Sequence, residues 1–186
     1  MRFNDLVALV EDIPPPPPAI VSKANDTKLT FDDIFNFIQS HEGTRPTMYL
    51  DSRKIPTIGI GFNLTRADAP ALLKSIGADY NLIMAKKQSL TSEQIKQLFQ
   101  ANLQVAYKDA KQYLPGFDGL PKQIKLVILD LSFNLGLPGL SKFVKFKAAI
   151  QTGNYAAAAR ELATSKWASQ VGNRANKLIN IISSFS

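Results

Sequence analysis

Three oxygen-bearing side chains follow one another closely in the first third of the chain. Glu42, Asp51 and Thr57 are separated by nine and then six residues, and the local pattern places each at the end or start of a different element. Hydrolysis of a glycosidic bond needs two carboxyl groups in unlike settings, because one must carry a proton while the other stays ionised. The segment is therefore a candidate glycosidase site, provided that folding turns the three groups toward a common groove.

Glu42 is predicted to end a helix. Thr30 and Asp33 form a capping-box pattern at its start, and Gly43 is typical of a C-terminal cap. A carboxylate in the last turn is disfavoured by the helix dipole by about 0.3–1 kcal/mol, so it holds a proton more tightly and suits a general acid. Taken alone, the Glu-Gly pair is more often the solvated tail of a surface helix. The apolar side chains recur at i, i+3, i+4 and i+7: Phe31, Ile34, Phe35 and Ile38.

A β-hairpin is predicted after this helix. Residues 47–50 and 55–62 are β-prone, and residues 51–54 have the composition of a turn. Asp51 begins the turn, so the strand before it carries this carboxylate back alongside the helix that ends at Glu42. On its own, Asp51 is more typical of an ordinary turn residue.

Gly59 and Gly61 lie one strand period apart in the second half of the hairpin. Their missing side chains leave one face open to another backbone or to a ligand. The pair is not a phosphate-binding loop, because no third glycine follows at the required spacing and no helix begins there.

Composition excludes several classes of site. The chain has no cysteine and one histidine, His41, which rules out a thiolate nucleophile and zinc–thiolate sites and disfavours a histidine-based triad or zinc motif. We expect no cofactor and no metal. His41 itself is interpreted as a helix-end residue that complements the dipole.

Charge is concentrated in the last third of the chain. Residues 1–119 contain thirteen basic and thirteen acidic residues, whereas residues 120–186 contain nine basic residues against Asp130 and Glu161, which accounts for the whole net charge of +7. A basic lobe favours polyanions such as nucleic acid, lipopolysaccharide, teichoic acid or the carboxylates of peptidoglycan. Charge alone does not choose among them. No apolar run reaches the length of a membrane span.

The chain divides into an N-terminal arm and one catalytic domain. Residues 1–28 contain the run Pro14 to Pro18 and are interpreted as an arm or linker. Residues 29–90 are expected to form a small lobe of helices and strands, residues 91–114 a long helix between lobes, and residues 115–186 a helical lobe.

The inter-lobe helix has clear boundary signals. Thr91 with Gln94 forms a second capping-box pattern and Pro115 stops the helix. About 23 residues at 1.5 Å each span roughly 35 Å, which is longer than one small lobe needs. Residues 121–136 become almost continuously apolar, as in a central core helix, and Asn173 is predicted as the N-cap of the last helix.

Two blocks of sequence resemble one family. Glu42-Gly43, Tyr49-x-Asp51 and Thr57-Ile-Gly-Ile-Gly61 resemble the active-site segment of the phage T4-type lysozymes, glycoside hydrolase family 24. The second block consists of Ser132-Phe-Asn-Leu-Gly136, Phe143, Trp167 and Gln170-x-x-Asn173-Arg174-Ala175. The resemblance covers residues 30–182. It implies an α+β, mostly helical, two-lobed fold with a small three-stranded antiparallel sheet.

The resemblance also implies a reaction. The substrate would be the β-1,4 bond between N-acetylmuramic acid and N-acetylglucosamine in peptidoglycan, cleaved with inversion. Glu42 would donate the proton, Asp51 would stay ionised, and Thr57 would help to hold the attacking water. Arg174 would pair with Glu42 across the cleft. The residues implied to contact substrate are Phe133, Arg174, Asn63 and Tyr49. Trp167 is expected to pack in the core rather than stack on a sugar.

Delivery and partners are expected to follow from the substrate. The first twelve residues are too short and too acidic-flanked for a signal peptide, so an upstream module, carrier or delivery machinery would bring a protein made in the cytoplasm to the periplasm or cell wall. We expect a monomer that binds no nucleic acid. An endolysin, a tail enzyme, a bacteriocin and a secreted antibacterial effector remain alternatives.

One departure and two rival functions accompany the resemblance. Phe62 stands where the family usually has histidine, so the ion pair that this histidine makes in relatives must be absent. A lytic transglycosylase uses one glutamate and needs neither Asp51 nor Thr57. A non-catalytic module that binds cell wall or nucleic acid through the basic lobe would make Glu42 dispensable.

Overall fold

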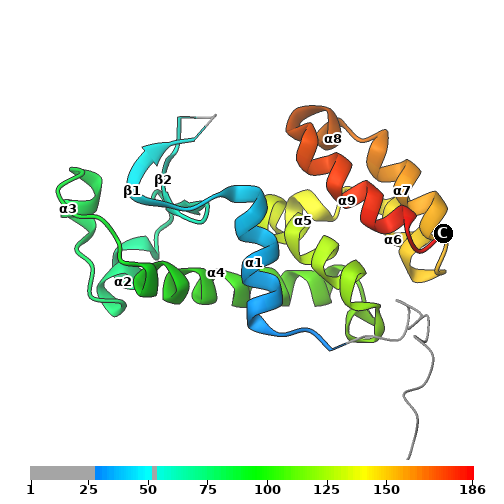
Figure 1. Ribbon diagram of the computed structural model, residues 1–186, viewed down its shortest axis with the longest axis horizontal. Helices are drawn as coiled ribbons and strands as arrows, with labels where there is room; N and C mark the ends of the chain where they lie inside the picture. Colours follow the sequence, from blue (N-terminus) through cyan, green and yellow to red (C-terminus); the bar gives the residue numbers. More distant parts are fainter. Residues whose placement is uncertain (1–27, 52–53) are drawn as a thin grey trace, which may run out of the picture.

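A computed structural model describes residues 28–51 and 54–186, and the predicted arm over residues 1–28 lies almost wholly outside them (Figure 1). The strands are β1 (Arg45–Leu50), β2 (Pro56–Gly59) and β3 (Phe62–Asn63). The helices are α1 (Phe31–Glu42), α2 (Ala69–Ser75), α3 (Tyr80–Met84), α4 (Ser92–Tyr113), the 3-10 helix η2 (Phe117–Gly119), α5 (Lys122–Leu140), α6 (Val144–Gln151), α7 (Tyr155–Ala163), α8 (Lys166–Val171) and α9 (Asn173–Ser183). This mostly helical arrangement with a small antiparallel sheet confirms the predicted fold class.

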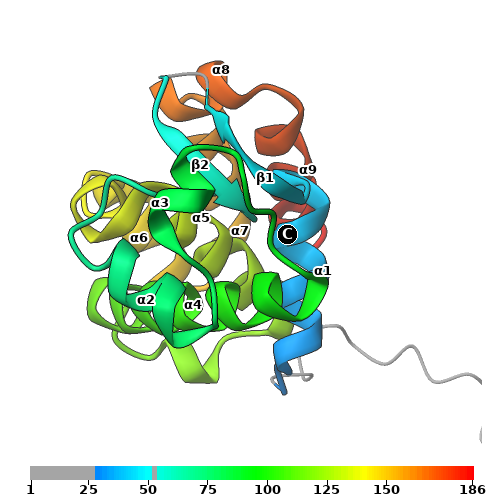
Figure 2. The ribbon, with the colours of Figure 1, turned by 90° about the vertical axis from the view of Figure 1, so that its left-hand side faces the viewer.

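The two lobes lie at opposite ends of α4. Figure 1 shows the sheet, α2 and α3 toward one end and α6 to α9 toward the other, with α5 packed along α4; Figure 2 views the molecule from the end that holds α2 and α3. The Thr91 side chain accepts from the backbone N–H of Gln94 and the Gln94 side chain accepts in return, so α4 begins at the predicted capping box. The long helix therefore fixes how the sheet stands relative to the helical lobe.

Helix α1 also ends where predicted. Asp33 Oδ2 accepts the backbone N–H of Thr30 at 2.9 Å, and Thr30 Oγ1 accepts that of Asp33 at 3.2 Å. At the other end, Gly43 has a φ of 70° and donates its N–H to the carbonyl of Gln39 at 2.9 Å. Glu42 is consequently the last residue of the helix.

The sheet has the order β1-β2-β3 with antiparallel pairing throughout. Tyr49 pairs with Thr57, and Thr57 pairs with Asn63. The single strand expected over residues 55–62 is divided, because Gly59 and Gly61 both adopt positive φ and turn the chain between β2 and β3. The glycines therefore make a turn rather than the bare face of one strand.

Helix α5 forms the centre of the core, and its residues from Ile124 to Ser132 are all buried. Gly136 leaves the helical conformation with a φ of 62°, where the sequence predicts the helix to end, and a further turn runs to Leu140. Two details differ from expectation. Helix α8 was not predicted, and the N-cap of α9 is Gly172 rather than Asn173.

Candidate active site

Glu42 lies at the junction of α1, the sheet and α9. Its side chain is 20% exposed, and its Oε1 accepts a hydrogen bond from Arg174 Nη1 at 2.5 Å. The carboxyl also approaches Gly61 so closely that a Cβ built there would stand 3.4 Å from Oε2. The missing side chain at Gly61 therefore gives the Glu42 carboxyl its place against the β2–β3 turn.

Asp51 and Thr57 are tied to each other through the backbone of Ile55. Asp51 Oδ1 accepts the Ile55 N–H at 2.8 Å, and the Ile55 carbonyl accepts the Asp51 N–H at 3.0 Å and the Thr57 hydroxyl at 2.9 Å. Thr57 is only 4% exposed. Since the Thr57 proton is directed at Ile55, the oxygen presents its lone pairs to any further partner.

Register brings three of the predicted site residues to one face of the sheet. Tyr49, Thr57 and Asn63 stand opposite one another on successive strands, and directly opposed residues share a face. Asp51 follows the last residue of β1, and its carboxylate accepts the Ile55 N–H across the turn. The sheet therefore gathers a phenol, a hydroxyl and an amide on one face, with a carboxylate in the adjoining turn.

Tyr49 connects this face with Glu42. Burial is the main reason why the pKa of the Tyr49 hydroxyl is raised above its usual range, and the negative charges of Glu42 and Asp51 raise it further. The Arg45 guanidinium, 4.5 Å from the centre of the Tyr49 ring, acts in the opposite direction. The charges of both carboxylates thus act on one phenol.

Two predicted substrate residues also have structural roles. Asn63 Oδ1 accepts both the backbone N–H and the hydroxyl of Thr65, each at 2.7 Å. Phe133 is half-buried, packs against the hydrophobic core and lies 5.3 Å from the ring of Phe99. Phe133 therefore packs on the core cluster.

A buried network behind Glu42 was missed by sequence reasoning. The carboxylate of Asp130, on α5, is fully buried and contacts His41 Nδ1 at 3.1 Å and Arg174 Nε at 2.9 Å. His41, whose side chain is 3% exposed, is therefore more than a helix-end residue. The available signal was an aspartate inside an apolar run, since such a residue is rarely buried without a partner.

The departure at residue 62 has a visible structural basis. Phe62 is 2% exposed and belongs to the core, with the Arg66 guanidinium 5.2 Å from its ring centre. Arg66 in turn donates to Asp68 and Asn102 at 2.6 Å each. At the position where the family usually has histidine, this chain therefore has a buried phenylalanine that packs against Arg66.

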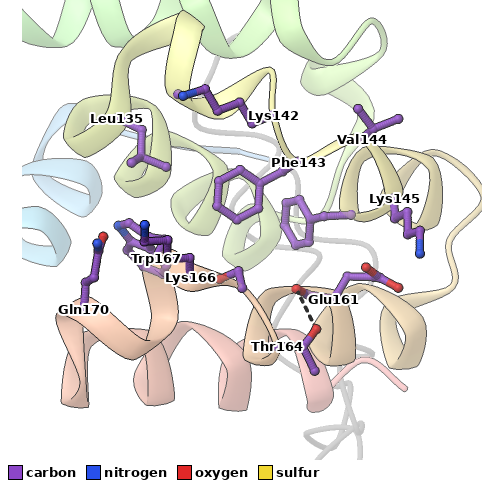
Figure 3. A pocket seen from close by; sticks show the side chains of 13 residues that line it. Leu135, Lys142, Phe143, Val144, Lys145, Glu161, Thr164, Lys166, Trp167 and Gln170 are labelled. Atoms are coloured by element: carbon purple, nitrogen blue, oxygen red, sulfur yellow. Dashed lines mark hydrogen bonds between the residues drawn. The ribbon is translucent and has the colours of Figure 1, made fainter.

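A cavity of about 620 Å³ opens in the helical lobe, away from these groups (Figure 3). Its lining is largely apolar with lysines among it, and includes Leu135, Lys142, Phe143, Val144, Lys145, Phe146, Glu161, Lys166, Trp167 and Gln170. Trp167 is 6% exposed and its Nε1 donates to Asn134 Oδ1 at 2.9 Å. Tryptophan burial agrees with the predicted core role, although one side of the ring faces the cavity.

Two kinds of feature are absent from the described part of the chain. Within residues 28–51 and 54–186, no three histidine, aspartate or glutamate side chains group as a metal site would require. No helix in the same ranges has the length and apolar character needed to cross a membrane.

The architecture and the residues gathered at the end of α1 define a lysozyme-like glycosidase. A small sheet, a long connecting helix and a helical lobe surround a glutamate at a helix end and an aspartate in a hairpin. Comparison with known families makes the assignment specific. The family model described as phage lysozyme matches residues 39–181, and the chain belongs to this family.

Named relatives agree with this assignment. The chain is 28% identical over 158 residues to probable T4-type lysozyme 1 of Dictyostelium discoideum, covering 80% of this chain and 92% of the relative. Probable T4-type lysozyme 2 of the same organism is 27% identical over 154 residues, covering 78% and 91%. The pre-baseplate central spike protein Gp5 of Enterobacteria phage T4 is 25% identical over 155 residues, which cover 78% of this chain and 26% of the spike protein.

Family membership establishes the general activity. The chain is a glycoside hydrolase of the muramidase type that degrades bacterial peptidoglycan, and it acts on the cell wall. The similarity to a phage spike protein links the chain to phage proteins of this family.

Proposed function

We propose that the chain is an inverting muramidase in which Glu42 is the general acid and Asp51 and Thr57 position the attacking water. The observation that supports this most directly is that the Glu42 carboxyl lies against Gly61 in the β2–β3 turn, while Asp51 and Thr57 are both bonded to the Ile55 backbone just before β2. Two carboxyls beside one small sheet, one at a helix end and one in a hairpin, are the unlike pair that the chemistry needs.

The reaction follows from the two environments. Glu42 gives its proton to the glycosidic oxygen, and the bond from that oxygen to the anomeric carbon breaks. Asp51 stays ionised, stabilises the positive charge on the sugar and takes a proton from the incoming water. The water oxygen bonds to the anomeric carbon from the opposite face, which inverts the configuration.

Thr57 suits the water-positioning role because of its own hydrogen bond. Its hydroxyl donates to the Ile55 carbonyl at 2.9 Å, so a water would be held as a donor to the Thr57 oxygen. The same Ile55 residue fixes Asp51 through its N–H. One backbone unit therefore sets the separation of the two groups that hold the water.

The wider organisation remains that expected from the sequence. The sugar chain would lie between the sheet and α9, with Tyr49, Asn63, Phe133 and Arg174 contacting it. Residues 29–90, 91–114 and 115–186 would form the first lobe, the connecting helix and the second lobe. The arm over residues 1–28 would join the domain to an upstream module or delivery machinery, and the protein would act as a monomer.

Digestion of purified peptidoglycan by wild type and Glu42→Gln tests the proposal. Wild type should release new reducing ends. The summed mass of the products should exceed that of the intact glycan by one water for each bond cleaved. Glu42→Gln should lose at least about 100-fold in rate, the low end of a general acid's contribution. Glu93→Gln, an exposed site in the first turn of α4, is the matched control and should retain activity.

The same digest separates the rival functions. A 1,6-anhydro product, lighter by one water, would identify a lytic transglycosylase. Clearing of a cell-wall suspension by Glu42→Gln at the wild-type rate would remove Glu42 from the mechanism. Proton NMR during the reaction should show that the α-anomer appears first from a β-linked substrate, and a first-formed β-anomer would contradict inversion.

A further inference from the structure

Four residues form a ring behind the candidate site, closed by three side-chain contacts and by the peptide bond between His41 and Glu42. His41 contacts Asp130, Asp130 contacts Arg174, Arg174 contacts Glu42, and Glu42 follows His41 directly in α1. The ring joins α1, α5 and α9, which are far apart in sequence. Its centre is Asp130, whose two carboxylate oxygens are both engaged and whose side chain is 0% exposed.

Arg174 makes two contacts with Asp130 and one with Glu42. Its Nε donates to Asp130 Oδ2 at 2.9 Å, and its Nη2 lies 3.5 Å from the backbone carbonyl of the same residue. Only Nη1 reaches Glu42. Because the guanidinium is planar and rigid, two contacts on one side fix the direction of the third.

The charge within the ring is shared unequally. Burial by itself would lower the pKa of the Arg174 guanidinium, but the charges of Asp130 and then of Glu42 outweigh burial and raise the pKa above its usual range. One positive charge therefore serves two carboxylates. This matters because an arginine paired with a glutamate alone favours the ionised glutamate, whereas a general acid must hold its proton.

We propose that Asp130 is a positioning residue for hydrolysis: its carboxylate aims Arg174 at Glu42 while taking up much of the positive charge that would otherwise keep Glu42 ionised. The inference rests on the proposed role of Glu42 as general acid. His41 holds the other oxygen of Asp130 and so keeps the carboxylate in the orientation that Arg174 requires.

Other charged groups around Glu42 do not replace Asp130. Arg174 is the cation from α9, and His41 precedes Glu42 on α1. From the sheet side, the charges of Glu42 and Asp51 both act on Tyr49, and Arg45 stacks on the Tyr49 ring. Within the described residues, Asp130 is the carboxylate shown to bond to both His41 and Arg174.

The test is the pH profile of peptidoglycan hydrolysis by the full chain and by Asp130→Asn. Asparagine keeps the shape and the accepting oxygen of aspartate but removes its charge, so Arg174 should act on Glu42 undiminished. The alkaline limb of kcat/KM should then move to lower pH by about one unit, since an unshared opposite charge has an effect of this size. At the pH of its highest activity the variant should stay within about tenfold of wild type, because the group that donates the proton is still present.

Asp109→Asn is the matched control. Asp109 lies on α4, is half-buried and accepts the Leu137 N–H at 3.0 Å, so the variant makes the same change in net charge outside the ring. Its pH profile should coincide with that of wild type. A uniform loss of activity at every pH in Asp130→Asn, an unmoved alkaline limb, or a limb displaced to higher pH would each overturn the proposal.

A second variant keeps the test valid if Asp130→Asn does not fold. If Asp130→Asn is not native by circular dichroism, the double variant His41→Gln and Asp130→Asn places two amides opposite each other and should show the same displaced limb. The general-acid proposal is judged separately. If Glu42→Gln retains full activity, that proposal fails; if Glu42→Gln is inactive but the Asp130 variants keep the wild-type profile, only the positioning role fails.

Discussion

The first turn of α1 offers a stability prediction that can be worked out from the structure. Asp33 Oδ2 accepts the backbone N–H and the hydroxyl of Thr30 and also pairs with Lys122 Nζ at 2.9 Å, across to the start of α5. Asp33→Asn removes the charge from this contact. Asp32→Asn, in the same turn but exposed, is the matched control because it removes an equal charge from the helix end.

The magnitude follows from the pKa of Asp33. Its hydrogen bonds, first with the Thr30 hydroxyl and then with Lys122, lower this pKa from 3.8 to about 2. A shift of this size corresponds to at most about 2.4 kcal/mol. The Asp33 side chain is 28% exposed, so solvent screening reduces the expected contribution to about 1 kcal/mol. For a chain of this size, that loss lowers the melting temperature by about 2–4 °C.

The depressed pKa of Asp33 also fixes the direction in which its contribution to stability changes with pH. A carboxyl whose pKa is depressed on folding contributes stability that is present above its unfolded pKa and lost as the pH falls through its folded pKa. Urea denaturation at neutral pH should therefore show Asp33→Asn less stable than both wild type and Asp32→Asn. The gap between wild type and Asp33→Asn should shrink as the pH falls from about 4 to about 2.

Two results would refute this reasoning. Equal losses of stability in Asp33→Asn and Asp32→Asn at neutral pH would assign the effect to the helix dipole alone. A gap that stays constant down to about pH 2 would show that the charge of Asp33 is not what stabilises the turn.

Three further predictions concern the site and its supporting lobe. Gly61→Ala should lose about tenfold in activity because its Cβ would touch the Glu42 carboxyl. Gly153→Ala is the control: this glycine has the same φ of 69° but open space around it, so the variant should lose the same stability, about 1 kcal/mol, and stay active. Equal activities of the two variants would contradict this. Thr57→Val should lose about 100-fold in kcat while Thr57→Ser retains most of it, and full activity in the valine variant would exclude the water-holding role. Trp167→Phe should cost about 1–2 kcal/mol by urea denaturation, since it removes the bond to Asn134 and some buried area, and an unchanged midpoint would show that the indole N–H is dispensable.

Local signals explain why much of the fold was predictable. The capping boxes at Thr30 and Thr91 are hydrogen bonds between residues three apart, and the Gly43 cap is a hydrogen bond to the residue four positions earlier. Each helix boundary could therefore be inferred without knowing the fold. Helix α8 has similar signals, with Ser165 as N-cap and Gly172 after its end. Its six residues are too few for an apolar period to show, and it was missed for that reason.

Long-range pairing explains what could not be predicted. Arg174 was expected to meet Glu42 only because of a family resemblance, since 132 residues separate them. Asp130 meets His41 across 89 residues and Arg174 across 44. The aspartate within an apolar run signals that a buried partner must exist, but which partner it has depends on how α1 and α9 pack on α5.

The position of the single histidine separates this chain from the pattern that the family resemblance implies. That pattern has a histidine at position 62, on the sheet, whereas here Phe62 is buried beneath Arg66 and the one imidazole lies on α1, against Asp130. The imidazole therefore stands one residue from Glu42 and bonds to the carboxylate that also holds Arg174. A change in activity caused by His41→Gln would accordingly arise at α1, through Asp130, without any contribution from the sheet.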